Sequence, residues 1–238
     1  VLAAILLVGA WFRFRLLSEI PADLGPDLIH HYYDTLEILE GKCRIYFPDR
    51  ESLLFYWTAL CARVVGLSQW TLHLASALVG MATIIAVYLL GQETFNRQVA
   101  LLAALLLAIN RWHIALSRSG YPAVFTPLIT TLVLYPLIRA LRRRHFVDFA
   151  WSGLVLGLGF YTFTPFKLMP VVVVIGLTLY VSIKRRVELR SLLPRLLVMA
   201  LVALIVLAPT ARFAIERPKE YFARELVALR LKREQAES

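Results

Sequence analysis

The sequence has few of the residues that build disulfide frameworks or metal clusters. Two cysteines, Cys43 and Cys61, occur among its 238 residues, which is too few for either kind of site. The sequence also lacks an internal repeat and a low-complexity segment. It begins at Val1 within an apolar run, without an initiator methionine or the basic segment that opens a signal peptide. We therefore expect it to be a piece of a longer chain.

Apolar residues dominate what the sequence does contain. They make up 59% of the chain, and the mean hydropathy is +0.68, whereas soluble domains are nearer to about 45–50% apolar. A helix needs about 20 apolar residues to cross a bilayer. The sequence therefore predicts an all-α polytopic bundle with seven membrane spans, at about residues 1–18, 70–91, 98–117, 121–139, 148–163, 165–183 and 192–211.

Basic residues predict the orientation of these spans. Two dense clusters, Arg142–His145 and Lys184–Arg186, lie in short loops, and such clusters stay on the cytoplasmic side. Alternation then places the N-terminus in the cytoplasm. The net charge of +10 reflects these loops, and no nucleic-acid-binding motif accompanies it. The segments expected together on the extracytoplasmic face are the loop 19–69, the turns at 117–121 and 164–167, and the tail after Pro209.

The long loop 19–69 is predicted to contain two juxtamembrane helices. The first lies within Leu24–Gly41, and the second within Glu51–Leu67, which is apolar but is interrupted by Arg63 and suits a helix at the membrane surface. The predicted transmembrane module covers residues 1–211. Residues 212–238 form an amphipathic start of an extracytoplasmic loop or tail.

Acidic residues of this loop are the candidates for chemistry. Asp27 follows the Gly25-Pro26 turn and would begin a helix, so it is either a helix-capping residue or a carboxylate that takes a proton from a nucleophile. Asp34 lies two turns further and could orient a substrate or pair with Arg44 or Arg50. A divalent metal bound by His30 and His31 with an acid is disfavoured, because consecutive residues point to different faces of a helix.

Five basic residues lie at span ends on the side opposite the orienting clusters. They suit either an anionic ligand at the outer surface or contact between their long side chains and lipid headgroups. An arginine fork matches the oxygens of a phosphate, including a lipid-linked phosphate. The residues are Arg13, Arg15, Arg111, Arg118 and Lys167.

An ordered series of segments carries a family resemblance. It comprises Gly25–Gly41, Leu53–Gly66, Leu74–Thr83, Trp112–Arg118, Gly157–Lys167 and, after the last span, Pro218 with Phe222 and Arg224. In this order the segments resemble the N-terminal part of the polytopic GT-C glycosyltransferases. That group includes the dolichyl-phosphate-mannose protein mannosyltransferases, the aminoarabinose transferase of lipid A and the family-39-type bacterial enzymes.

The resemblance implies an inverting transfer of a sugar from a polyprenyl-phosphate donor to a glycan, lipid or protein acceptor. It assigns the catalytic acid-base role to Asp27 and a donor-binding role to Arg224. A basic pocket of Arg13, Arg118 and Lys167 would hold the lipid phosphate. Residues expected to line the site, or else to belong to the aromatic belt at the membrane surface, are His113, Tyr121 and Tyr161.

The chain departs from the family pattern at several positions. The acid that usually follows the catalytic aspartate is Leu28, and a second acid of some members is replaced by Thr126. His73 and Lys167 stand where arginines are common. The missing acids argue against a metal-assisted reaction. They also keep open two other classes of protein, a non-catalytic membrane scaffold and a lipid or solute transporter.

Overall fold

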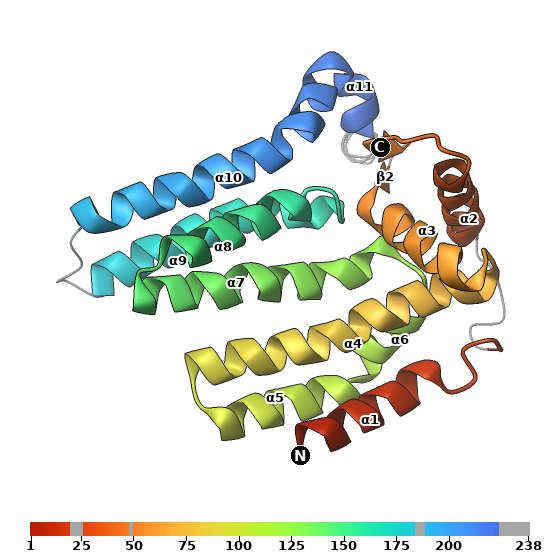
Figure 1. Ribbon diagram of the computed structural model, residues 1–238, viewed down its shortest axis with the longest axis horizontal. Helices are drawn as coiled ribbons and strands as arrows, with labels where there is room; N and C mark the ends of the chain where they lie inside the picture. Colours follow the sequence, from red (N-terminus) through yellow and green to blue (C-terminus); the bar gives the residue numbers. More distant parts are fainter. Residues whose placement is uncertain (20–25, 48–49, 184–188, 224–238) are drawn as a thin grey trace, which may run out of the picture.

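In the computed structural model the chain is an all-α bundle, as predicted, with one short β-hairpin (Figure 1). The structure describes residues 1–19, 26–47, 50–183 and 189–223. Its elements are α1 (Leu2–Phe14), α2 (Pro26–Leu39), β1 (Tyr46–Phe47), β2 (Arg50–Glu51), α3 (Leu53–Val65), α4 (Gln69–Thr94), α5 (Arg97–Ile109), α6 (Arg111–Arg118), η1 (Pro122–Val124), α7 (Phe125–Arg143), α8 (Phe146–Gly159), η2 (Thr164–Leu168), α9 (Met169–Ile183), α10 (Leu189–Glu216) and α11 (Pro218–Tyr221).

Four helical segments of the described chain are long and apolar enough to cross a membrane, and a bent pair would make a fifth. The bent pair is α5 with α6, which meet at 59°, whereas the sequence predicted one continuous span over 98–117. Helices α1, α3 and α8 are apolar but shorter. Two of the seven predicted spans, 1–18 and 148–163, therefore correspond to the shorter helices α1 and α8, and α3 lies within the predicted surface helix.

Small residues allow the long helices to approach closely, as is common in membrane bundles. A Cβ atom on Gly153 of α8 would lie 2.2 Å from the carbonyl oxygen of Met199 in α10. A side chain at this position would therefore separate α8 from α10, which run side by side in Figure 1.

The segments predicted to share the outer face do gather at one end of the bundle. Helices α2, α3 and α11 and the hairpin lie there, beside the ends of α4, α6 and α10 (Figure 1). Contacts between distant segments fix this end. The amide of Leu53 donates to the carbonyl of Tyr161 at 2.8 Å, and the hydroxyl of Thr164 donates to the buried carboxylate of Glu51 at 2.7 Å.

The opposite end carries Arg142–His145, one of the two basic clusters that predicted the orientation. The other cluster, Lys184–Arg186, lies outside the described residues. Here α4 turns into α5, and α7 turns into α8 (Figure 1). Arg139 forms an ion pair with the buried Asp148, and Arg143 pairs with Glu93 at 3.5 Å. These two ion pairs join α7 to α8 and to α4, while the side chains of Arg142–His145 remain exposed.

Candidate functional site

Asp27 lies in the first turn of α2, and its side chain is exposed. The next residue, Leu28, is buried and packs toward the turn that follows α6. Gly120 forms that turn with a φ of +73°, and a Cβ there would lie 3.4 Å from Leu28. A left-handed backbone favours glycine, and the packing places Asp27 at the surface above the turn. Leu28, which stands where an acid usually follows the catalytic aspartate in the family pattern, thus packs α2 against this turn.

His31 attaches α2 to the same turn. Its side chain is 2% exposed, and its Nδ1 lies 3.2 Å from the carbonyl oxygen of Gly120. Because a carbonyl oxygen only accepts hydrogen bonds, Nδ1 carries the proton. The His31 ring also contacts the rings of Phe55 at 5.3 Å and Tyr121 at 5.8 Å between centroids. His31 therefore joins α2 to the Gly120 turn through a hydrogen bond and two ring contacts.

Tyr121 is close enough to Asp27 for the two side chains to interact electrostatically. Partial burial and the negative charge of Asp27 both raise the pKa of the Tyr121 phenol. The phenol therefore stays protonated at neutral pH. A carboxylate that is exposed to an incoming hydroxyl can accept a proton from it, and a protonated phenol nearby can donate a hydrogen bond to the same ligand.

Asp34 is occupied by an ion pair. Its Oδ2 lies 3.2 Å from Nε of Arg50 in β2, and both side chains are largely buried. Burial raises the pKa of Asp34, and the positive charge of Arg50 opposes that rise. Of the two partners that the sequence offered, Arg50 is therefore the one used, whereas Arg44 pairs with Glu37 at 3.2 Å. The Asp34–Arg50 pair joins α2 to the hairpin.

Arg13 is fully buried and holds the break between α5 and α6. Its guanidinium donates to the carbonyl of Ala108 at 3.0 Å, close to the end of α5, where carbonyls lose their helical partners. It also donates to Nδ1 of His113 at 2.8 Å. Because arginine only donates, His113 accepts at Nδ1. Both residues thus stabilise the break between α5 and α6, and Arg13 is too deeply buried in this structure to contact a ligand.

Arg118 caps the C-terminal end of α1. One side chain satisfies several carbonyls that a helix end leaves without partners. The acceptors, at 2.9–3.2 Å, are the carbonyls of Phe12, Arg13, Arg15 and Leu16. Arg13 and Arg118 thus lie together, but Arg118 donates to backbone carbonyls and Arg13 donates to carbonyls and to the side chains of His113 and Ser117.

Lys167 and Tyr161 lie at the other side of this end of the bundle. The Lys167 ammonium is 4.3 Å from the centre of the Tyr221 ring, a cation–π contact between η2 and α11. The Tyr161 hydroxyl donates to the carbonyl of Val206 in α10 at 2.8 Å. Lys167 is therefore separate from the Arg13–Arg118 pair. The remaining predicted residue, Arg224, lies outside the described residues.

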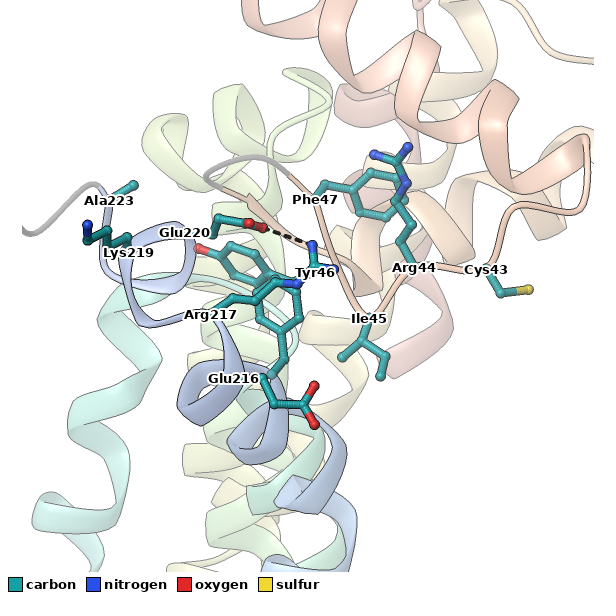
Figure 2. Close-up of a pocket in the computed structure, with 11 residues that line it drawn as sticks. Cys43, Arg44, Ile45, Tyr46, Phe47, Glu216, Arg217, Lys219, Glu220 and Ala223 are labelled. Carbon is teal, nitrogen blue, oxygen red and sulfur yellow. Dashed lines mark ion pairs between the residues drawn. The ribbon is translucent and has the colours of Figure 1, made fainter.

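A cavity of about 820 Å³ opens between the segment that precedes the hairpin and the end of α10. Figure 2 shows its lining side chains. One wall is Cys43–Phe47, and the other comprises Phe213, Glu216, Arg217, Lys219, Glu220 and Ala223. Within the described part of the chain, no group of three His, Cys, Asp or Glu residues is placed to hold a metal ion. Sequence reasoning did not find this cavity, because its two walls are about 170 residues apart in the chain.

Comparison with known proteins identifies the family. The model of the dolichyl-phosphate-mannose-protein mannosyltransferase family matches residues 50–213, more than half of the chain. The chain belongs to this family. It is 24% identical over 114 residues to a Bacillus subtilis (strain 168) protein named "Putative mannosyltransferase YkcB". That match covers 48% of the chain and 16% of the relative. No solved structure matches the chain significantly.

Membership of this mannosyltransferase family, together with the apolar helices, makes the chain a multi-pass membrane protein. The matched segment includes His113, Arg118, Tyr161 and Lys167 but begins after Asp27. The position of Asp27 therefore follows from the geometry of α2 rather than from the family match.

Proposed function

We propose that this chain forms part of a membrane glycosyltransferase, which transfers a sugar from a polyprenyl-phosphate donor to an acceptor on the extracytoplasmic face. The observation that carries the proposal is the position of Asp27 in a chain of this family. Its carboxylate is exposed in the first turn of α2. It lies close enough to Tyr121 to raise that residue's pKa, at the end of the bundle where the predicted outer segments gather.

In the proposed reaction Asp27 takes the proton of an acceptor hydroxyl. The acceptor oxygen forms a bond to the anomeric carbon of the donor sugar, while the bond between that carbon and the phosphate oxygen breaks. The polyprenyl phosphate leaves with the bonding electron pair. Attack from the face opposite the phosphate inverts the anomeric configuration, and the exposed carboxyl group then returns its proton to water.

The cations of the predicted phosphate pocket have different parts in this proposal. We retain Lys167 and, outside the described residues, Arg224 as contacts for the donor phosphate, because a phosphate at the membrane surface needs cationic partners. Arg13 and Arg118 hold helix ends through carbonyl contacts. We therefore assign them to positioning, through α6 and the Gly120 turn on which α2 rests. Asp34, His113 and Tyr161 support the site through their internal contacts.

A transporter, the alternative function, is expected to have broken membrane spans and buried ionisable groups. The described chain has such a break between α5 and α6, with Arg13 buried beside it. Hydrogen bonds from Arg13 to Ala108 and His113 supply a structural reason for the break. An enzyme therefore explains the exposed acid at α2, whereas a transporter leaves it without a role.

The test is transfer by the full-length protein in membranes. Sugars carried on radiolabelled polyprenyl phosphates are supplied with cell-envelope acceptors, and the same sugars on nucleotide diphosphates serve as the control donors. We expect label to reach the acceptor from the polyprenyl-phosphate donors alone. Transfer from the nucleotide donors would contradict the donor class, and absence of transfer across a broad donor panel would contradict the enzyme itself.

A further inference from the structure

The cavity between the Cys43–Phe47 segment and α10 continues into a second cavity of about 500 Å³. The second cavity is lined by Ala208, Pro209 and Arg212 of α10, and the two share Ile45, Phe213 and Glu216. Their combined shape has a polar part at the outer end of the bundle and a more apolar part that follows α10 toward the membrane. A ligand that fits both parts is amphipathic.

The polar part carries charges of both signs. Arg44, Arg217 and Lys219 line it together with the carboxylates of Glu216 and Glu220. Arg217 pairs with Glu220 at 3.5 Å, drawn as a dashed line in Figure 2. Arg44 also pairs with Glu37 at 3.2 Å, and Glu216 pairs with Arg212 at 2.6 Å. Because most charges of the lining are neutralised in this way, they offer a phosphate little net attraction. A neutral group with several hydroxyls would instead find donors in the guanidinium groups and acceptors in the carboxylates.

Aromatic rings form the back of the same cavity. Tyr46 packs against Phe213 with 5.3 Å between ring centroids and against Tyr221 with 5.2 Å. Pockets that combine an aromatic wall with a few polar groups bind small ligands of mixed character. A sugar ring has this character, because its C–H faces are apolar and its hydroxyls are polar. The volume of about 820 Å³ lies within the ordinary range for such sites, about 300–1,000 Å³.

Helix α10 gives the ligand a route from the bilayer. Of its most apolar 18 residues, 11% are buried inside the protein, so the described part of the chain leaves most of this helix open to lipid. A hydrocarbon chain can therefore lie along α10 at Ala208 and Pro209 while its head group enters the polar part. A lipid that arrives in this way need not leave the membrane.

From these observations we infer that the joined cavities bind a glycolipid with an uncharged saccharide head group, with the saccharide between Arg44 and Arg217 and the lipid chain along α10. Its role as the acceptor of the transferred sugar rests on the proposed function, whereas binding itself does not. The site borders the donor phosphate contact assigned to Lys167, because the Lys167 ammonium lies over the ring of Tyr221, which packs against Tyr46 of the cavity wall.

Cys43 reports on this site without any measurement of activity. It is an exposed free thiol at the edge of the cavity, where the lining segment Cys43–Phe47 begins (Figure 2), and the chain's other cysteine, Cys61, is buried in α3. With Cys61→Ala as the background, the rate of maleimide alkylation of Cys43 is measured on the protein in phosphatidylcholine nanodiscs. The probes are dodecyl maltoside, which has a neutral disaccharide head, and dodecyl phosphate, which has the same chain and an anionic head.

We expect dodecyl maltoside to slow alkylation about tenfold at saturation, because a bound head group covers the thiol, and dodecyl phosphate to leave the rate unchanged. Ile45→Trp fills the wall that the two cavities share and should abolish the slowing. Its matched control is Ile29→Trp on α2, at a side chain of nearly equal exposure, 44% against 43% for Ile45. The control should retain the slowing.

Equal protection by dodecyl phosphate would overturn the inference in favour of an anionic lipid. Absence of protection by dodecyl maltoside, or protection that survives Ile45→Trp, would overturn it as well. The outcome is independent of the proposed function. Protection in a protein that transfers no sugar would contradict the enzyme alone, and transfer without protection would contradict this site alone.

Discussion

His31 of α2 and Gly120, 89 residues later in the chain, are joined by a buried hydrogen bond of 3.2 Å from the imidazole Nδ1 to the backbone carbonyl. Asp27 lies one helical turn before His31. The bond therefore fixes the position of the exposed carboxylate over the turn that carries Tyr121. In the proposed enzyme, Asp27 lies on α2, and other side chains of α2, such as His31, fix the position of this helix.

The His31 bond predicts the effect of its removal. His31→Phe keeps a ring but leaves the Gly120 carbonyl without a donor, which we expect to lower the free energy of unfolding by about 1–3 kcal/mol. His31→Asn retains an N–H donor and should lose less. Thermal unfolding of the purified protein measures both. The neighbouring His30 is exposed, so His30→Phe serves as the control; an equal loss in this variant would contradict the assignment.

Arg13 gives a prediction that separates a structural role from ligand binding. Arg13→Met keeps much of the side-chain volume but removes the donors to Ala108 and His113. We expect a loss of at least about 2 kcal/mol in unfolding free energy. Arg15→Met, at an exposed residue, should cost less than about 0.5 kcal/mol. Unchanged stability with a loss of donor binding would instead support the phosphate role that the sequence suggested.

Asp34 predicts a pH dependence of stability. Burial raises the pKa of Asp34 above that of an unfolded chain, so the folded protein binds this proton more tightly. The contribution of Asp34 to stability is therefore fully present below the ordinary aspartate pKa. It is lost as the pH rises through the raised pKa.

This dependence can be measured as the unfolding temperature between pH 3 and pH 7, a range of about four units that brackets the aspartate titration. Asp34→Asn should remove this component of the profile. Glu40→Gln, which changes an exposed acid just beyond α2, should leave the profile as in the wild type. A profile unchanged by Asp34→Asn would show that the ion pair with Arg50 cancels the effect of burial, and a profile changed in the opposite sense would show that the ion pair outweighs it.

Cys43 also tests the predicted orientation. It is exposed at the end of the bundle that we assign to the extracytoplasmic face. A membrane-impermeant maleimide added to intact cells, or to spheroplasts where a wall or outer membrane intervenes, should label Cys43. In a Cys43→Ser background, the variant His145→Cys places a thiol at the opposite, basic end and should react after the membrane is opened. Labelling in the reverse order would contradict the assignment.

The sequence predicted the features of the fold that follow from local pattern. The apolar runs located the long helices, and the Gly25-Pro26 turn located the start of α2. Asn110, which interrupts the predicted third span, caps α6 by accepting a hydrogen bond from the amide of His113 at 2.8 Å. Asparagine favours such caps. The break itself is completed by Arg13, nearly 100 residues away, and pattern reasoning has no access to that contact.

For the candidate site, the sequence indicated which residues to consider but not which atoms they contact. Asp27 is the predicted catalytic acid because a turn precedes it and a family resemblance assigns its role. Arg13 and Arg118 were expected to bind a phosphate, and in this structure they donate to backbone carbonyls and, for Arg13, to the His113 side chain. His31 was considered as a metal ligand, whereas its partner is the carbonyl of Gly120. Charge alone does not reveal whether a donor faces a ligand or the protein.

The measurement that tests the central claim most directly is sugar transfer by Asp27→Asn in membranes. The substitution keeps the shape of the side chain and removes the base, so the account predicts a loss of at least about 100-fold in transfer rate with an unchanged unfolding temperature. Glu40→Gln, the matched removal of another exposed acid next to the same helix, should transfer as the wild type does. Wild-type rates in Asp27→Asn would contradict the assignment of Asp27 as the catalytic base.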